Sequence, residues 1–178
     1  MNISSQARDT ATCAKINAQE LRSILTYLPD IGEFRWRVSR GPGARPGSPA
    51  GTACCGGRYR KITINGTQYQ EHRLVWLYVH GVWPPAWIDH INRDGCDNRL
   101  TNLRLSTPAE NAANRRAHRN SRAGLKGVLA RPNGTWCARI MKAGKSRFLG
   151  SFNNPEDAHN AYVLAANRLF GEFANPGN

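Results

Sequence analysis

The sequence predicts an α+β protein with two parts. A strand, loop, strand and helix occupy the middle of the chain, and a small three-stranded antiparallel sheet packed on one helix follows. Short β-prone runs separated by Asn-Gly and Ala-Gly turns predict the strands, and segments with apolar residues at helical spacing predict the helices. With 178 residues, the chain can bury a core in one domain or in two small ones.

The first elements are a helix, a strand and a long loop. Residues 15–28 place apolar side chains near helical spacing, with Asn17 as a candidate N-cap and Glu20 three residues later, and so predict a short amphipathic helix. The run GEFRWRV at residues 32–38 alternates apolar and charged side chains and predicts a strand. Residues 39–57 are rich in Gly and Pro and predict an irregular loop.

A hairpin and a second helix lead into the central part. An Asn-Gly step at Asn65 lies between two β-prone runs, which predicts the hairpin. Residues 72–81 predict a compact apolar helix that ends at a glycine. Residues 87–111, WIDHINRDGCDNRLTNLRLSTPAEN, then indicate a strand, a loop over residues 91–101, a second strand and the start of a helix.

Polar side chains from three successive elements should meet in this central stretch. His90 ends the first strand, Asn102 begins the second, and Asn111 lies in the helix, for which Thr107 is the expected N-cap. The carboxylate of Asp89 beside the histidine, together with an amide oxygen from the helix, would form a hard-oxygen site for a divalent cation such as Mg²⁺. The histidine can remain free of the metal.

A second, smaller unit should follow a basic linker. Residues 125–152 indicate three short strands joined by turns at Asn133-Gly134 and Ala143-Gly144. Residues 154–171 indicate one helix, with Asn154 as its N-cap.

The charge of the chain favours a nucleic-acid partner. Its formal net charge is +13 and its sequence pI is near 10.3. Between Glu110 and Glu156 there are ten Lys and Arg residues and no acidic residue, with Trp136 and Phe148 interleaved among them. The candidate DNA contacts are Arg93, Arg104, Arg115, Arg116, Arg119, Arg122, Lys126, Arg131, Trp136, Arg139 and Arg147.

Other classes of protein have weaker support. No run has the length of a signal peptide or a membrane span, so we expect a cytoplasmic protein without a membrane partner. The five cysteines are odd in number and show no CxxC spacing, which argues against a disulfide framework or a structural zinc site. A metal site formed in space by Cys54, Cys55 and Cys96 stays open.

At these residues a family resemblance becomes visible. Residues 71–114 resemble the HNH endonucleases, a group with a ββα-metal active site found in phage and intron-encoded homing enzymes, through HRLVW, IDHIN, DNRLTNLR and STPAEN. Residues 124–174 are similar to the DNA-binding domain of plant ethylene-response factors of the APETALA-two type, through KGV, GTWCARI, FLGSF and EDAHNAYVLAANRLFG. Leu129, Asn133 and Met141 stand where that plant family tends to place base-contacting Arg or Trp.

The resemblance implies a division of the chain and a role for each site residue. The implied parts are a lead-in at 1–70, the HNH core at 71–118, a basic linker at 119–124 and the DNA-binding domain at 125–178. In the HNH motif, His90 would be the general base, Asp89 and Asn111 the metal ligands, and Asn102 a supporting residue. Because all four precede the linker, we expect a fragment ending near Asn120 to retain the cleavage centre.

The implied activity is that of a phage-encoded, homing-type DNA endonuclease in a bacterial host. It would use Mg²⁺, which Mn²⁺ may replace, and would cut double-stranded DNA to leave 5′-phosphate and 3′-hydroxyl ends. No obligate protein partner is evident in the sequence. Two alternatives remain: a DNA-binding regulator that does not cleave, and an RNA-processing nuclease.

Overall fold

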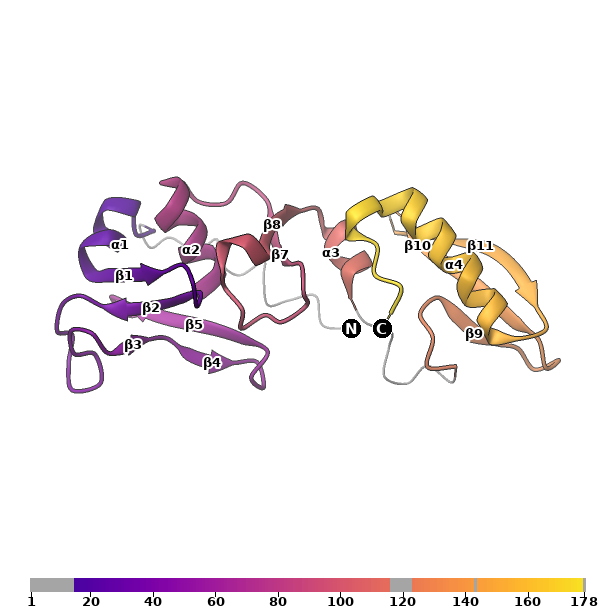
Figure 1. The fold of residues 1–178 in the computed structure, drawn as a ribbon, viewed down its shortest axis with the longest axis horizontal. Coiled ribbons are helices and arrows are strands. Elements are labelled where there is room, and N and C mark those ends of the chain that lie inside the picture. Colours follow the sequence, from indigo (N-terminus) through magenta and orange to yellow (C-terminus); the bar gives the residue numbers. More distant parts are fainter. Residues whose placement is uncertain (1–14, 116–122, 143, 178) are drawn as a thin grey trace. The chain divides into compact units, whose positions relative to one another are not determined.

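The structure, a computed structural model, describes residues 15–115, 123–142 and 144–177 (Figure 1). The chain forms two compact units, one comprising residues up to Pro84 together with Gly95–Leu100, the other Pro85–Asp94 together with residues from Thr101 onward. The α+β class is confirmed, with several small antiparallel sheets. No helix among the described residues is long and apolar enough to span a membrane.

The first unit contains two three-stranded sheets and two helices. Its elements in chain order are α1 (Ala18–Ile24), β1 (Leu25–Leu28), β2 (Glu33–Trp36), β3 (Pro49–Ala50), β4 (Thr52–Cys54), β5 (Tyr59–Ile64), β6 (Thr67–Gln70) and α2 (Glu71–His80). The sheets have the orders β1-β2-β3 and β4-β5-β6. The predicted hairpin is confirmed at β5–β6, where Asn65 and Gly66 both have positive φ, as its two-residue turn requires.

Two predictions for this unit are wrong in part. The helix expected over residues 15–28 ends at Ile24, because Leu25 and Tyr27 alternate with less buried neighbours and pair with β2 as a strand. The segment expected to be irregular over residues 39–57 contains β3 and β4. Strands of two and three residues are too short to show the alternation from which a strand is predicted.

The loop that follows β7 packs within the first unit. The hydroxyl of Tyr27 donates to the carbonyl of Asn98 (2.9 Å) and accepts from the backbone N–H of Leu100 (3.1 Å). Gly32 meets the same loop so closely that a Cβ there would lie 2.4 Å from the backbone nitrogen of Arg99. The first unit therefore fixes residues 95–100 through buried backbone contacts.

The second unit holds a two-stranded ladder, a short helix, and the C-terminal sheet with its helix. Its elements are β7 (Trp87–His90), the 3₁₀ turn η1 (Leu100–Asn102, which begins in the first unit), β8 (Leu103–Ser106), α3 (Pro108–Asn114), β9 (Val128–Ala130), β10 (Trp136–Lys142), β11 (Lys145–Phe152), α4 (Pro155–Phe170) and a second 3₁₀ turn, η2 (Gly171–Phe173).

The predicted three strands and one helix at the C-terminus are confirmed. The sheet has the order β11-β10-β9, all antiparallel, and α4 covers one of its faces (Figure 1). Val128, Ala138 and Ala158 form one buried cluster between sheet and helix, and Ile140, Tyr162 and Ala166 form another. Asn154 caps α4 as expected, since its side chain accepts from the N–H of Asp157.

Candidate catalytic centre and nucleic-acid interface

The ladder of β7 and β8 places the predicted Asp-His pair at the end of a strand. Asp89 lies opposite Arg104, and His90 lies opposite Leu103. Asp89 and His90 are only 4% and 6% exposed. Polar groups buried to this extent require hydrogen-bond partners, and those partners fix how the two side chains are oriented.

The carboxylate of Asp89 is held from two elements. Arg104 donates from Nε (3.0 Å) and Nη2 (2.9 Å) to Oδ2, and Nδ2 of Asn114 lies 3.1 Å from Oδ1 and 3.0 Å from Oδ2. The same Asn114 amide donates to the backbone carbonyl of His90 (2.8 Å). One side chain of α3 thus ties together the two adjacent residues of β7.

Asn102 braces the turn that follows His90. Its Oδ1 accepts from the N–H of Asn92 (3.0 Å), and its backbone carbonyl accepts from the N–H of Ile91 (2.9 Å). The N–H of Arg93 closes the turn on the carbonyl of His90 (2.9 Å), with Arg93 at a φ of 67°. A non-glycine residue with positive φ is uncommon and persists where its surroundings determine it.

Helix α3 begins with a complete capping box. The side chain of Thr107 accepts from the N–H of Glu110, and the carboxylate of Glu110 accepts from the N–H of Thr107 (2.7 Å). That bond lowers the pKa of the Glu110 carboxyl group. Asn111 is half-buried and precedes Asn114 by three residues, so both side chains project from one face of α3. This is the face that contacts Asp89 through Asn114.

The donor set at this centre suits Mg²⁺. Oδ1 of Asp89 accepts one hydrogen bond among the described residues, which leaves a lone pair for a cation, and Asn111 offers an amide oxygen. Mg²⁺ commonly takes one or two protein oxygens and completes its octahedron with water and phosphate oxygens. The described residues contain no group of three His, Cys, Asp or Glu side chains that could hold a metal on its own, and that includes Cys54, Cys55 and Cys96.

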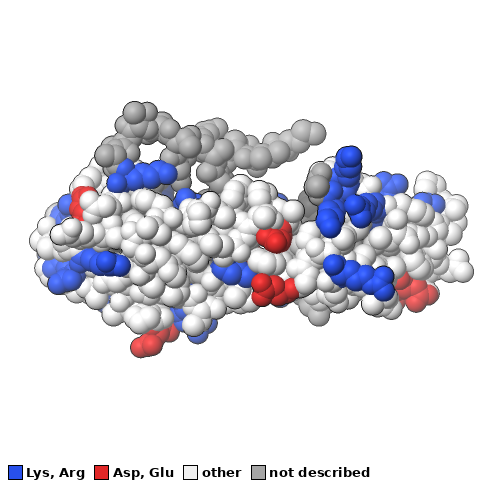
Figure 2. Space-filling model, turned by 90° about the horizontal axis from the view of Figure 1, so that it is seen from above, with Lys and Arg blue, Asp and Glu red and all other residues white. Residues whose placement is uncertain are grey.

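The outward face of the C-terminal sheet is basic and apolar. Arg139 lies opposite Phe148 on the neighbouring strand, and the guanidinium of Arg131 lies 5.4 Å from the centre of the same ring. Leu129, Met141 and Phe148 are each more than half exposed on this sheet. Figure 2 shows groups of Lys and Arg side chains over the C-terminal part of the chain. We refer to Leu129, Arg131, Arg139, Met141 and Phe148 as the outer sheet face.

Several of the expected DNA contacts lie elsewhere. Trp136 packs against the buried cluster under α4, and Arg147 lies opposite Ile140, whose side chain also faces α4. Residues paired directly across strands share a face, so neither Trp136 nor Arg147 belongs to the outer sheet face. Arg115 is exposed at the end of α3. Arg116, Arg119 and Arg122 lie outside the described residues.

Three other cations are occupied by protein groups. Nη1 of Arg93 donates to Oδ1 of Asn175 (3.0 Å), and Arg104 is bound to Asp89. The Lys126 ammonium donates to the carbonyls of Ala113, Arg115 (2.5 Å) and Asn175 (3.2 Å). Burial and the nearby charge of Arg93 lower the pKa of Lys126 to about 8.

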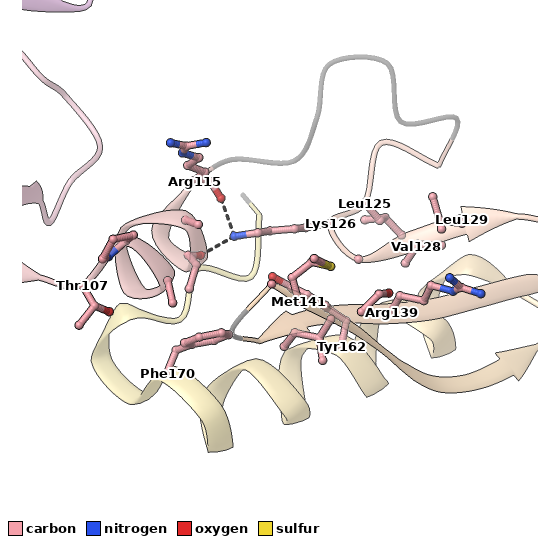
Figure 3. Close-up of a pocket in the computed structure, with 18 of the residues that line it drawn as sticks. Thr107, Arg115, Leu125, Lys126, Val128, Leu129, Arg139, Met141, Tyr162 and Phe170 are labelled. Atoms are coloured by element: carbon pink, nitrogen blue, oxygen red, sulfur yellow. Dashed lines mark hydrogen bonds between the residues drawn. The ribbon is translucent and has the colours of Figure 1, made fainter. Parts of the chain in front are cut away.

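A largely apolar cavity of about 1280 Å³ lies between α3 and the C-terminal sheet. Figure 3 shows Lys126 reaching from the sheet side to the end of α3 along this cavity. Asp89, His90, Asn102 and Asn111 do not line it. The cavity is therefore distinct from the candidate centre.

Comparisons of the sequence with known proteins identify the family of this chain. A profile of the HNH endonucleases matches residues 69–113. Protein 3.8 of Escherichia phage T7 is 31% identical over 108 residues, which span 59% of this chain and 88% of that protein. The chain belongs to the HNH endonuclease family. An uncharacterised HNH endonuclease of Acanthamoeba polyphaga mimivirus is 34% identical over 109 residues, which are 60% of this chain. The match spans about half (56%) of the length of the mimivirus protein.

A plant relative matches part of the chain. An AP2/ERF and B3 domain-containing transcription repressor of Arabidopsis thaliana is 33% identical over 91 residues, which span 51% of this chain and 24% of the repressor. The chain is thus similar both to an HNH endonuclease and to a plant AP2/ERF protein.

Sequence reasoning missed two residues that hold the candidate centre, Asn114 and Asn175. Asn114 is 7% exposed and joins Asp89 to His90, and its spacing of three residues from Asn111 is a local signal that could have identified it. Asn175 is 5% exposed and donates to the carbonyl of Asn114 (2.7 Å). No local pattern marks Asn175, because its partner lies 61 positions away in the chain.

Asn114→Ala should destabilise the second unit more than Asn111→Ala does. The first change leaves the buried Asp89 carboxylate and the His90 carbonyl short of a donor, at a cost of about 1–3 kcal/mol. Asn111 is half-buried and makes no side-chain hydrogen bond within the described residues, so its replacement should cost less than about 1 kcal/mol. Urea unfolding followed by circular dichroism measures both, and equal losses would contradict the role given to Asn114.

Proposed function

We propose that this HNH family member is a metal-dependent DNA endonuclease of the homing type, phage-encoded, that hydrolyses phosphodiester bonds to 5′-phosphate and 3′-hydroxyl ends. The observation that carries the proposal is the Asp89–His90 pair at the end of β7, held by Arg104 from β8 and by Asn114 from α3. A histidine fixed beside a carboxylate and an amide oxygen combines a general base with cation ligands.

His90 is the proposed general base. In its neutral form the imidazole takes a proton from the attacking water, which adds to phosphorus in line with the leaving 3′ oxygen. Asn102 orients this histidine by fixing the backbone after it, because its carbonyl and its Oδ1 accept hydrogen bonds from the N–H groups of Ile91 and Asn92. Because the backbone around His90 is fixed on both sides and the residue is only 6% exposed, the ring has little room to leave the position in which it receives the proton.

Asp89 and Asn111 are the proposed cation ligands. A Mg²⁺ bound there would stabilise negative charge on the phosphate and on the leaving oxygen. Mn²⁺ has similar oxygen preferences and should substitute. Arg104 and Asn114 keep the Asp89 carboxylate in one orientation, with Oδ1 available to the cation.

The outer sheet face is the proposed reader of double-stranded DNA. A two-stranded ribbon or small sheet fits the major groove, where Arg pairs with the O6 and N7 atoms of guanine. On this face Arg139 lies opposite Phe148, and the guanidinium of Arg131 lies 5.4 Å from the centre of the same ring. Arg115 and the basic residues that follow it would contact phosphates and contribute affinity without sequence discrimination.

His90→Ala should lower the cleavage rate by about 10² to 10⁴ while folding and DNA binding persist. General-base assistance contributes about 10² to 10⁴ in rate. Wild type and variant are each incubated with supercoiled plasmid and with RNA, in Mg²⁺ or in EDTA, and compared by initial rate and thermal melting. Cleavage of RNA alone would favour an RNA-processing nuclease, and binding without cleavage in Mg²⁺ would favour a regulator.

Asn111→Ala should lose activity through the cation and respond to more metal. Loss of one of two protein oxygens should shift the Mg²⁺ or Mn²⁺ concentration for half-maximal rate upward by about tenfold or more. The His90→Ala variant, which lacks a base and keeps both ligands, serves as the control and should keep the wild-type midpoint. Titration of both metals against cleavage rate tests this, and equal midpoints in the three proteins would contradict the ligand assignment.

Arg139→Ala should relax sequence discrimination. A bidentate contact to guanine is worth about 1–3 kcal/mol of preference over the wrong base. Arg147→Ala removes the same charge from the side of the sheet that faces α4 and is the matched control. Binding of both variants to a duplex selected from a random pool, and to its scrambled version, gives the two affinity ratios. Equal ratios would mean that the outer sheet face does not read bases.

A further inference from the structure

The segment Gly171–Gly177, which follows the last helix, reaches the residues that hold Asp89. The carbonyl of Glu172 accepts from Nη1 of Arg104 (3.0 Å), and the guanidinium carbon of Arg104 lies 3.8 Å from the centre of the Phe173 ring. The side chain of Arg104 is 14% exposed, and its Nε and Nη2 donate to Asp89. The C-terminal segment therefore fixes the guanidinium of Arg104, and that guanidinium in turn fixes the carboxylate of Asp89.

Asn175 makes a second connection to the same centre. Its Nδ2 donates to the carbonyls of Asn114 (2.7 Å) and Arg115 (3.2 Å), and its Oδ1 accepts from Arg93 (3.0 Å) and Gly177 (2.8 Å). The two carbonyls belong to the end of α3, where backbone acceptors have no partner within the helix. Asn175 thus caps the helix that carries Asn111 and Asn114.

The ββα elements are too short to hold this geometry alone. The β7–β8 ladder has two strands of four residues, and α3 has seven residues. Two-stranded ladders and helices of this length are marginal in water without packing from other elements. In this chain, part of that packing comes from residues 171–177.

We propose that residues 171–177 form a positioning element of the cleavage centre, acting on Asp89 through Arg104 and on α3 through Asn175. This inference rests on the proposed function and deepens it. It replaces the sequence-based expectation that a fragment ending near Asn120 retains the centre. The C-terminal part of the chain then serves cleavage as well as DNA binding.

Phe173→Leu and Phe173→Tyr form the first test. Leucine keeps apolar volume and loses the ring face under Arg104, whereas tyrosine keeps that face. Phe173→Leu should lower the cleavage rate at saturating DNA by about tenfold, the range of a desolvated cation–π contact. Phe173→Tyr should stay within about twofold of wild type, and DNA affinity should be unchanged in both.

Asn175→Asp is an independent variant for the second connection. It keeps the acceptor for Arg93 and replaces the donor to Asn114 by a carboxylate oxygen that faces a carbonyl. Cleavage should fall by about tenfold or more, because hydrogen bonds at a buried helix end are lost. Asn160→Asp adds the same charge on the exposed surface of α4 and should cleave like wild type.

A spectroscopic readout separates positioning from general stability and needs no turnover. The Hε of Arg104, bound to Asp89 at a Nε to Oδ2 distance of 3.0 Å, should give a slowly exchanging NMR signal in wild type and in Phe173→Tyr. Phe173→Leu should lose this signal while the amide signals of β9 to β11 remain. Added Mn²⁺ should partly restore cleavage to Phe173→Leu.

The outcomes distinguish the two proposals. A persistent Arg104 Hε signal in Phe173→Leu, or unchanged cleavage when that signal is lost, would overturn the positioning role. A wild-type protein that cleaves no DNA would overturn the proposed function, and the Hε signals would then still decide whether residues 171–177 hold Arg104.

Discussion

The burial of the Asp89 carboxylate is the constraint on which the candidate centre depends. An ionised carboxylate at 4% exposure is stable only with charged and hydrogen-bonding partners, and losing one of them is far more costly than losing a surface pair. Arg104 and Asn114 supply those partners from β8 and α3. The buried Asp89 carboxylate therefore connects the β7–β8 ladder to α3.

This constraint reaches beyond the ββα elements. Arg104 and Asn114 are themselves supported by Glu172, Phe173 and Asn175, which follow α4 in the chain. A centre built on a two-stranded ladder gains rigidity from this support without needing a larger core of its own. The arrangement also explains why residues 85–94 and the C-terminal sheet fall in one compact unit.

Strand alternation separates two roles within the C-terminal sheet. On β10, Ala138 and Ile140 face α4 with Trp136, while Arg139 lies between them on the outer sheet face. A shift of one residue in register would bury the arginine and expose the core. Core packing against α4 therefore determines which cations lie on the outer sheet face.

Short sequence patterns predicted those elements whose formation depends on neighbouring residues in the chain. The Thr107 cap, the hairpin at Asn65 and α4 follow from short sequence patterns, and all three were found where expected. The two- and three-residue strands β3 and β4 were missed, because a strand so short is defined by its partner. The sequence did not show that Arg104 and Lys126, both expected as DNA contacts, bind protein groups, because a cation's partner cannot be predicted from its own neighbourhood.

The same reasoning explains Asn175. Its contact with Asn114 spans 61 residues, and such a contact exists only after the second unit has folded. In this chain the spacing of the motif identified Asp89, His90, Asn102 and Asn111, whereas Asn175 comes from the segment after α4. A local sequence pattern can therefore identify the Asp-His pair of this chain but not the residues that hold Asn114 and Arg104 in place.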